Sequence, residues 1–315
     1  MKKLVIPAVK RATEWRFALQ ACSLASCAPA VAVKQPPEAP VGILQLDRQN
    51  PVVHAMVNGN DLLLRVALDA KDVVELNPSA VSRLGLAFEP GFNADVGRVT
   101  LPGISATASI TITGHPVLAL LSSHGRDCCA GVDGTISPAL LPFAEIRFAD
   151  GASAGGRVET LVLEHDEEHG LEAPVTIGAE RISLQFSLER PDTQSSSSAG
   201  AILARAYRGH FAGAEIDVDA AFGIKRPART IAFPRSISLA GFAFDHIATR
   251  IADFAGRYDF PADRSEPGDI VVKRRTTQQQ AWPVVSIGRD HMDRCGEIAY
   301  HTQTHLLSLR CDFDG

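Results

Sequence analysis

The sequence predicts a mainly β protein built from two similar halves. Most of its segments are short, rich in β-branched residues and bounded by Gly, Pro, Asn or Asp, which is typical of strands and hairpins. The helical candidates are few and brief. The same order of parts occurs twice, over residues 50–150 and again over residues 172–312. An internal repeat of this kind predicts two copies of one structural unit.

The first half opens with VVHAMVNGNDLLLRVAL, in which an Asn-Gly pair between two apolar runs predicts a hairpin. The second run ends at Asp69. A short helix is expected in NPSAVSRLGL, because Asn77 stands before Pro78 as an N-cap does. A hairpin over residues 98–113 and the segment GVDGTISPALLPF, whose Ser137-Pro138 predicts another brief helix, complete this half.

The second half repeats these parts in the same order. It runs from PVTIGAERISLQFSL through an acidic turn to a helix in SSAGAILARAYRG and a long hairpin region. It ends with VVSIGRDHMDRCGEIAYHTQTHLLSLRC, which predicts a short helix and a final hairpin. Residues 160–172 are expected to join the two halves.

Composition excludes some classes of function. The chain has 315 residues, 45% of them hydrophobic, and a net charge of -5. This composition predicts a substantial buried core. The acidic balance and the lack of a basic block argue against a nucleic-acid partner. No apolar run is long enough to predict a membrane-spanning helix.

The N-terminal 40 residues have the pattern of an export signal followed by a Pro-rich spacer. Basic residues precede the apolar run FALQACSLASCAPAVAV. Within this run, LASC, which ends at Cys27, resembles the lipobox of bacterial lipoproteins, whose cysteine is lipidated. Ala28-Pro29-Ala30 offers an ordinary cleavage site instead, and an unprocessed N-terminus is the third alternative. The expected location is the periplasm, or the outer membrane through a lipid anchor, with no other membrane contact.

The cysteines that follow this signal fit an oxidising compartment. Cys295 and Cys311 flank GEIAYHTQTHLLSLR, so a disulfide across the base of the predicted hairpin is expected. The neighbouring Cys128 and Cys129 have no evident role. The chain has no C-x-x-C spacing, and HDEEH at 165–169 carries Asp166 where a zincin motif needs Glu. We therefore expect no metal, and a solvated acidic loop at HDEEH.

At the level of motifs, the chain resembles the aspartic-peptidase superfamily, in particular its retropepsin-like and pepsin-like bacterial members. VNGNDLLLRVALDA resembles the hairpin that ends in Asp-Thr-Gly, and GTISPALLPF the motif and helix that follow. VVSIGRDHMDRCGEIAYHTQTHLLSLRC is similar to the closing motif and hairpin of the family. The resemblance spans residues 45–312 and implies two pseudo-symmetric β-barrel lobes, over residues 41–160 and 161–315.

The resemblance also implies a chemistry. In that family two aspartates share one proton and hold a water that attacks the peptide carbonyl. The Thr and Gly of each motif support the carboxylates, and a flap hairpin, here residues 98–113, closes over the substrate. No cofactor is needed beyond water. The expected partner is a peptide or protein.

Both motifs of this chain depart from the family pattern. In the first half Asp69 is kept, but Ala70 and Lys71 replace the Thr and the Gly. A lysine beside Asp69 would favour the ionised carboxylate and oppose proton sharing. In the second half the acid is Asp192, followed by Thr193, or alternatively Glu189.

Three hypotheses follow. The first is an exported aspartic-type endopeptidase with Asp69 and Asp192 as catalytic pair, Glu189 being the alternative second acid. Ala70, Lys71 and Thr193 would line its substrate cleft. The second is a catalytically inactive binding protein of the cell envelope with the same two-lobed fold. The third is an unrelated β-sandwich.

Overall fold

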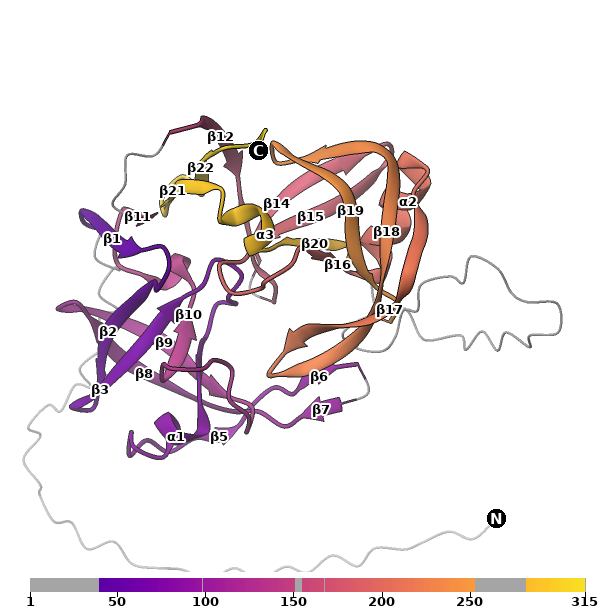
Figure 1. Cartoon of the computed structure of the whole chain (residues 1–315). Coiled ribbons are helices and arrows are strands. Elements are labelled where there is room, and N and C mark those ends of the chain that lie inside the picture. The colour runs from indigo at the N-terminus through magenta and orange to yellow at the C-terminus, as the bar shows by residue number, and fades with distance from the viewer. Residues whose placement is uncertain (1–39, 98, 151–154, 167, 253–281, 315) are drawn as a thin grey trace, which may run out of the picture. The chain divides into compact units, whose positions relative to one another are not determined.

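A computed structural model describes residues 40–97, 99–150, 155–166, 168–252 and 282–314, and there the protein is mainly β (Figure 1). The first part of the chain forms β1 (Ile43–Asp47), β2 (Val52–Val57), β3 (Asn60–Val66), β4 (Val74–Leu76), α1 (Pro78–Val81), β5 (Glu89–Pro90), β6 (Ala94–Val96), β7 (Val99–Leu101), β8 (Ile104–Ile112), β9 (His115–Ser123), β10 (Gly134–Ile136), the 3₁₀ helix η1 (Pro138–Leu140) and β11 (Glu145–Ala149).

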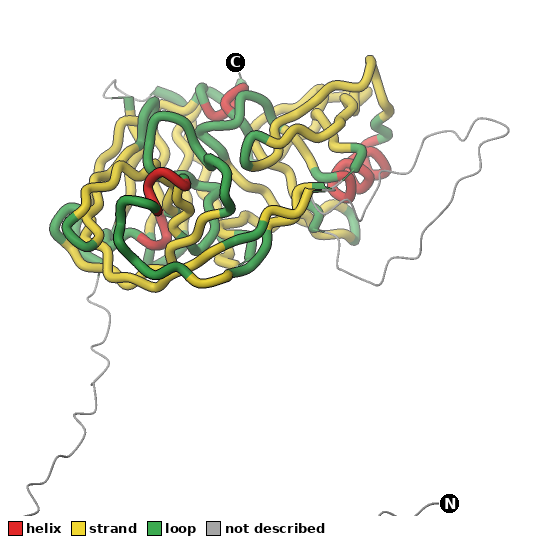
Figure 2. The backbone as a smooth tube through the Cα atoms, turned by 90° about the horizontal axis from the view of Figure 1, so that it is seen from below, coloured by secondary structure: helices red, strands yellow, loops and turns green. Residues whose placement is uncertain are grey.

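The second part contains longer strands. It forms β12 (Arg157–Val162), β13 (Glu164–Asp166), β14 (Gly170–Ile177), β15 (Glu180–Phe186), β16 (Gln194–Ser195), α2 (Ser197–Tyr207), β17 (His210–Ala221), β18 (Ile224–Leu239), β19 (Phe242–Arg250), β20 (Val284–Ile287), α3 (Arg289–Met292), β21 (Cys295–His301) and β22 (Leu306–Cys311). Figure 2 shows how short the helices are beside the strands.

The internal repeat of the sequence corresponds to a repeat of sheet topology. One sheet has the order β2-β3-β10-β4-β9-β8-β5, and another contains β14-β15-β20-β16-β19-β18-β17. The direction of every neighbouring pair also agrees. For example, β3–β10 and β15–β20 are parallel, and β10–β4 and β16–β20 are antiparallel. We call residues 52–136 the first repeat and residues 170–287 the second repeat.

The first repeat is a closed barrel, because β2 also pairs with β8 and completes a ring of six strands. No corresponding β14–β18 pairing closes the second repeat within the described residues. Parallel pairs inside each repeat distinguish this arrangement from the antiparallel β-sandwich considered above, because sandwich sheets pair antiparallel neighbours.

A further sheet combines strands from the flanks of both repeats, in the order β1-β11-β21-β22-β12. The β21–β22 hairpin brings Cys295 opposite Cys311, and a disulfide joins them, as the sequence suggested. Arg48, directly after β1, is buried and binds Asp150 through two nitrogens and Asp293 through a third. The guanidinium therefore ties the end of β1 to the segments after β11 and α3.

Local sequence explains most of these elements. Asn58 and Gly59 both have positive φ, 49° and 76°, and form the turn that the Asn-Gly pair predicted between β2 and β3. Alternate residues of these strands are buried, as the two-residue period of a strand requires. In α2, Ser196 accepts a hydrogen bond from the Ala199 amide, and Arg208 ends the helix in the left-handed region.

The described residues all belong to one compact unit, Glu38–Gly315. The expected signal, including Cys27, lies outside the described residues. No helix within the described ranges has the length and apolar character needed to cross a membrane. The boundary expected near residue 160 stays a prediction.

Candidate functional site

Two corresponding loops carry the acids that the sequence singled out. In the first repeat, Ala67 and Leu68 separate the end of β3 from Asp69. In the second repeat, Ser187 and Leu188 separate the end of β15 from Glu189 in the same way. Of the two second-half alternatives, Glu189 therefore corresponds to Asp69.

Asp192 occupies a different place in its loop. It lies directly before Thr193 and β16, and it is exposed. The Asp-Thr dipeptide resembles the family motif, but it lies farther from the end of β15 than Asp69 lies from the end of β3. The catalytic pairing of Asp69 with Asp192 stays a prediction, and the topology of the repeat favours Glu189 as the residue that corresponds to Asp69.

Asp69 is held by an arginine of the other repeat. Its Oδ2 lies 3.4 Å from Nε of Arg190, and both side chains are largely buried, at 15% and 22% exposure. The other two guanidinium nitrogens donate to the carbonyls of Asp219 and Ala220, each at 2.9 Å. Nε makes no hydrogen bond to the carboxylate, so the contact is an ion pair, and it places Asp69 beside the end of β17.

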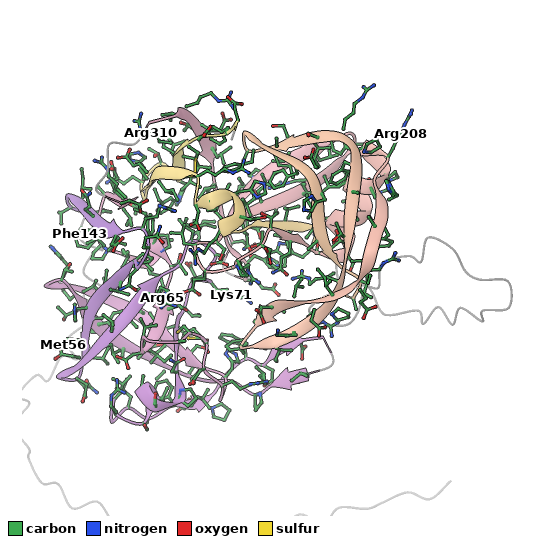
Figure 3. The ribbon with its side chains drawn as sticks, in the orientation of Figure 1. Met56, Arg65, Lys71, Phe143, Arg208 and Arg310 are labelled. Atoms are coloured by element: carbon green, nitrogen blue, oxygen red, sulfur yellow. A yellow bond between two sulfur atoms is a disulfide. The ribbon has the colours of Figure 1, made fainter. Side chains whose placement is uncertain are left out.

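Glu189 of the second repeat is bound by an arginine of the first repeat. Its Oε1 accepts a hydrogen bond of 2.8 Å from Arg65, which lies on β3 of the first repeat (Figure 3). The same guanidinium donates to the Ala130 carbonyl at 3.0 Å. We call Asp69–Arg190 and Glu189–Arg65 the crossed ion pairs, since each joins an acid of one repeat to an arginine of the other.

The crossed ion pairs change what these carboxylates can do. A water-activating pair needs two carboxylates that share a proton, which their mutual repulsion favours. Here each carboxylate faces a guanidinium of the other repeat, at 3.4 Å for Asp69 and at 2.8 Å for Glu189. Each acid is therefore paired with an arginine, and no described contact joins the two acids to one another.

Ala70 and Lys71, which follow Asp69, were expected to line a substrate cleft. Lys71 is exposed, and the cation bound to Asp69 is Arg190. The Ala70 carbonyl faces Gly170, where a Cβ would come within 2.4 Å of it. The loop after Asp69 thus packs closely against the start of β14.

Thr193 is buried within the second repeat, whereas a cleft position was expected. Its hydroxyl donates to Asp290 at 2.8 Å and accepts from the Gly288 amide at 3.0 Å. Asp290 also lies 3.1 Å from Nδ1 of His291. Burial raises the pKa of the Asp290 carboxyl, but the bonds from His291 and Thr193 outweigh burial and hold that pKa below its usual value.

This lowered pKa makes part of the stability dependent on pH. A carboxyl with a lower pKa in the folded state stabilises the fold above its unfolded pKa of about 4, and this contribution is lost as pH falls through the folded value. We expect Asp290→Asn to flatten the fall in unfolding free energy between about pH 5 and about pH 2. Urea unfolding at several pH values measures this. The same substitution at exposed Asp61 is the control, and equal slopes for both variants would contradict the assignment.

In HDEEH, His165, Asp166 and Glu168 are exposed, as expected, and His165 and Asp166 belong to β13. Nε2 of His165 lies 2.7 Å from Asp72, and the His169 ring stacks on Trp282 at 4.2 Å. His165 also stacks on His305, whose Nδ1 lies 3.0 Å from the Tyr300 hydroxyl. Burial, with the charge of Asp72, raises the pKa of Tyr300 to about 12. Among the described residues, no group of His, Cys, Asp and Glu has a metal-binding arrangement.

The flap expected over residues 98–113 is divided between two sheets. β8 belongs to the barrel, whereas β6 and β7 form a separate hairpin over Ala94–Leu101. At the turn of this hairpin, the Arg226 side chain of β18 occupies the space of a Cβ at Gly97. The β6–β7 hairpin therefore reaches the second repeat. Val99 of the hairpin is exposed, as are Phe92 and Ile104 on either side of it in the sequence.

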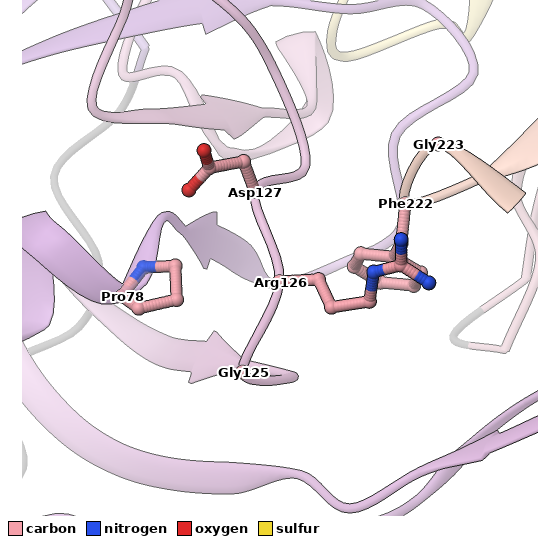
Figure 4. A pocket seen from close by; sticks show the side chains of 6 residues that line it. All are labelled: Pro78, Gly125, Arg126, Asp127, Phe222 and Gly223. Carbon is pink, nitrogen blue, oxygen red and sulfur yellow. The ribbon is translucent and has the colours of Figure 1, made fainter.

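A pocket opens beside this hairpin between the two repeats. Pro78 and residues 125–127 line one side, and Phe222 and Gly223 of the β17–β18 turn line the other. The Arg126 side chain extends toward Phe222 (Figure 4). Next to the pocket, the buried His124 ring packs between Phe92 and Phe222 and binds Glu75 at 3.0 Å.

The two arginines of the crossed ion pairs were not found from the sequence. Neither arginine belongs to a recognisable motif, because Arg65 is a strand residue and Arg190 simply follows Glu189. The adjacency of Glu189 and Arg190 was the sequence signal that could have indicated an arginine near the acids. Comparisons of the chain with protein-family models and with curated proteins find no match.

Proposed function

We propose that this chain is a binding protein with a two-lobed fold of the acid-protease type, and that it does not hydrolyse peptides. The crossed ion pairs carry this proposal. Each acid at a position that resembles the catalytic one is bound to an arginine of the other repeat. The carboxylates then serve to hold the two repeats together, and water activation is lost.

The proposed ligand is an extended peptide with apolar side chains. Phe92, Val99 and Ile104 are 45%, 41% and 38% exposed on and around the β6–β7 hairpin. Phe92 contacts His124, which contacts Phe222 of the pocket, and the backbone of Gly103, next to Ile104, approaches both Phe92 and His124. Val99 lies on the hairpin whose Gly97 meets Arg226 of the second repeat. Apolar contacts here would supply affinity, and Arg126 and Asp127 would supply polar contacts at the pocket.

Hydrolysis and binding are tested separately with one fluorogenic and one fluorescein-labelled peptide library. We expect no cleavage from about pH 3 to about pH 7, the range in which acid-protease dyads work. Cleavage that Asp69→Asn abolishes would overturn the proposal. Binding, followed by fluorescence anisotropy, is expected in the wild type.

The position of the ligand is tested by a matched pair of variants. Val99→Asp places a charge on the hairpin and is expected to weaken peptide binding about tenfold or more, because it removes apolar contact. Val162→Asp makes the same change on β12, where the valine is 64% exposed. Equal affinities of both variants would place the ligand elsewhere.

We also propose export, with attachment to the membrane through a lipid on Cys27. The support is the LASC sequence after a basic and apolar lead. In cell fractionation, the protein is expected with membranes, and Cys27→Ser is expected in the soluble fraction. An unchanged distribution would contradict lipidation.

A further inference from the structure

Cys128 and Cys129 lie in the loop between β9 and β10, and both are free thiols. Asn77 holds this dipeptide from two sides. Its Oδ1 accepts the Cys128 amide at 2.8 Å and lies 3.3 and 3.8 Å from the two sulfurs. Its Nδ2 donates to the Cys129 carbonyl at 2.9 Å.

This use of Asn77 is unexpected for a helix N-cap. Asn77 begins α1, but its side chain makes no capping hydrogen bond there. The side chain instead gathers both thiols around one oxygen. Both sulfurs therefore lie within 3.8 Å of one oxygen, and the two thiols are close enough to interact.

From this geometry we propose that Cys128 and Cys129 form a reversible redox site, in which a small-molecule disulfide such as glutathione disulfide converts the dithiol to a vicinal disulfide. The inference is independent of the proposed binding function. Cys128 is half-buried and Cys129 is buried, so the first attack belongs to Cys128.

The exchange takes two balanced steps. The Cys128 thiol loses its proton, and its sulfur bonds to one sulfur of the glutathione disulfide, releasing one glutathione thiolate. The Cys129 thiol then loses its proton, and its sulfur attacks Cys128 sulfur, releasing the second glutathione thiolate. The two released protons convert these thiolates to thiols. The protein loses two electrons and glutathione disulfide gains them.

Two physical features predict how this site behaves. A hydrogen bond with the Cys129 thiol, together with burial, raises the pKa of the Cys128 thiol above its usual value. Since the thiolate is the nucleophile, the oxidation should be slow at neutral pH and faster at alkaline pH. A disulfide between neighbouring residues closes a small ring through the planar peptide bond that joins them, so the product should be strained and easily reduced.

The loop that carries the two cysteines also contributes to the pocket and to one of the crossed ion pairs. The same loop supplies Arg126 and Asp127 to the pocket. It also supplies the Ala130 carbonyl that binds Arg65, the partner of Glu189. Closing the disulfide must turn the peptide between the two cysteines, and it therefore acts on both features.

Peptide mapping tests the proposal on the full chain. Trypsin cleaves after Arg126 and Arg147, so the fragment 127–147 contains Cys128 and Cys129 and no other cysteine. The protein is incubated with glutathione disulfide, quenched with acid, alkylated and digested. We expect this fragment to take up no alkyl group and to be lighter by two hydrogen atoms, and to take up two alkyl groups after mild reduction.

Internal controls make the result decisive. The Cys295–Cys311 bond, which links fragments 295–310 and 311–315, is expected to survive the mild reduction, because both cysteines are buried, at 1% and 0% exposure. Cys129→Ser is expected to stop at glutathione bound to Cys128, and Cys128→Ser is expected to react little. A wild-type fragment that stays fully alkylatable, or that also stops at bound glutathione, overturns the proposal.

Discussion

Arg190→Met is expected to lower the free energy of unfolding by about 3 kcal/mol, because it leaves the largely buried Asp69 carboxylate without its cation. It also leaves the carbonyls of Asp219 and Ala220 without a charged donor. Methionine keeps most of the aliphatic stem, so the change isolates the guanidinium. Urea denaturation gives the free energy.

Arg205→Met is the matched control for this prediction. Arg205 binds Glu180 at 2.6 Å, but the two side chains are 65% and 47% exposed. Exposed pairs contribute less than about 1 kcal/mol, since water screens the charges. A loss at Arg190 no larger than that at Arg205 would show that the crossed ion pairs do not hold the repeats together.

Arg48→Met is the second change with a large expected effect, again about 3 kcal/mol of unfolding free energy. The Arg48 side chain is 5% exposed, and Asp150 and Asp293 are its partners. These acids are 30% and 42% exposed and regain water when the arginine is lost, which limits the effect. The loss should therefore lie at the lower end of the range for broken buried pairs.

Arg289→Met provides the control, because Arg289 binds the same Asp293 from an exposed position, with 46% of its side chain accessible. We expect this variant to stay within about 0.5 kcal/mol of the wild type. Because Arg48 joins the ends of β1, β11 and α3, Arg48→Met should also shift the unfolding midpoint far more than Arg289→Met does. Similar midpoints for the two variants would contradict the role given to Arg48.

The mainly β fold and its repeat could be predicted because they depend on local signals. The Asn-Gly turn, the alternation of β2 and β3, and the short helical segments are each encoded within a few neighbouring residues. Because these parts recur in the same order, the repeat can also be recognised in the sequence. The helix predicted in NPSAVSRLGL is shorter than its pattern, since α1 ends at Val81.

The site could be predicted only in part, because its contacts are distant in sequence. Asp69 was found as the residue that ends an apolar strand. Arg65 and Glu189 lie far apart in the chain, and no periodicity connects them. The choice between Asp192 and Glu189 depends on the residue at which β15 ends, and motif similarity does not give that position. The flap was misplaced because Pro102 and Gly103 separate β7 from β8.

Asn77 illustrates a second limit of local reasoning. Its place before Pro78 predicted the start of α1 correctly, and α1 does begin at Pro78. The side chain, however, binds Cys128 and Cys129 instead of capping the helix. A local pattern gives the backbone position, whereas the hydrogen-bond partner depends on which loop folds over it.

If Arg190 pairs with Asp69 across the two repeats, substitutions of the two residues must be coupled, and a double-mutant cycle measures that coupling. The cycle compares the unfolding free energies of wild type, Asp69→Asn, Arg190→Met and the double variant in urea. We predict a coupling of about 1 kcal/mol or more, as found for residues in direct contact. Additive effects, with a coupling indistinguishable from zero, would contradict the account.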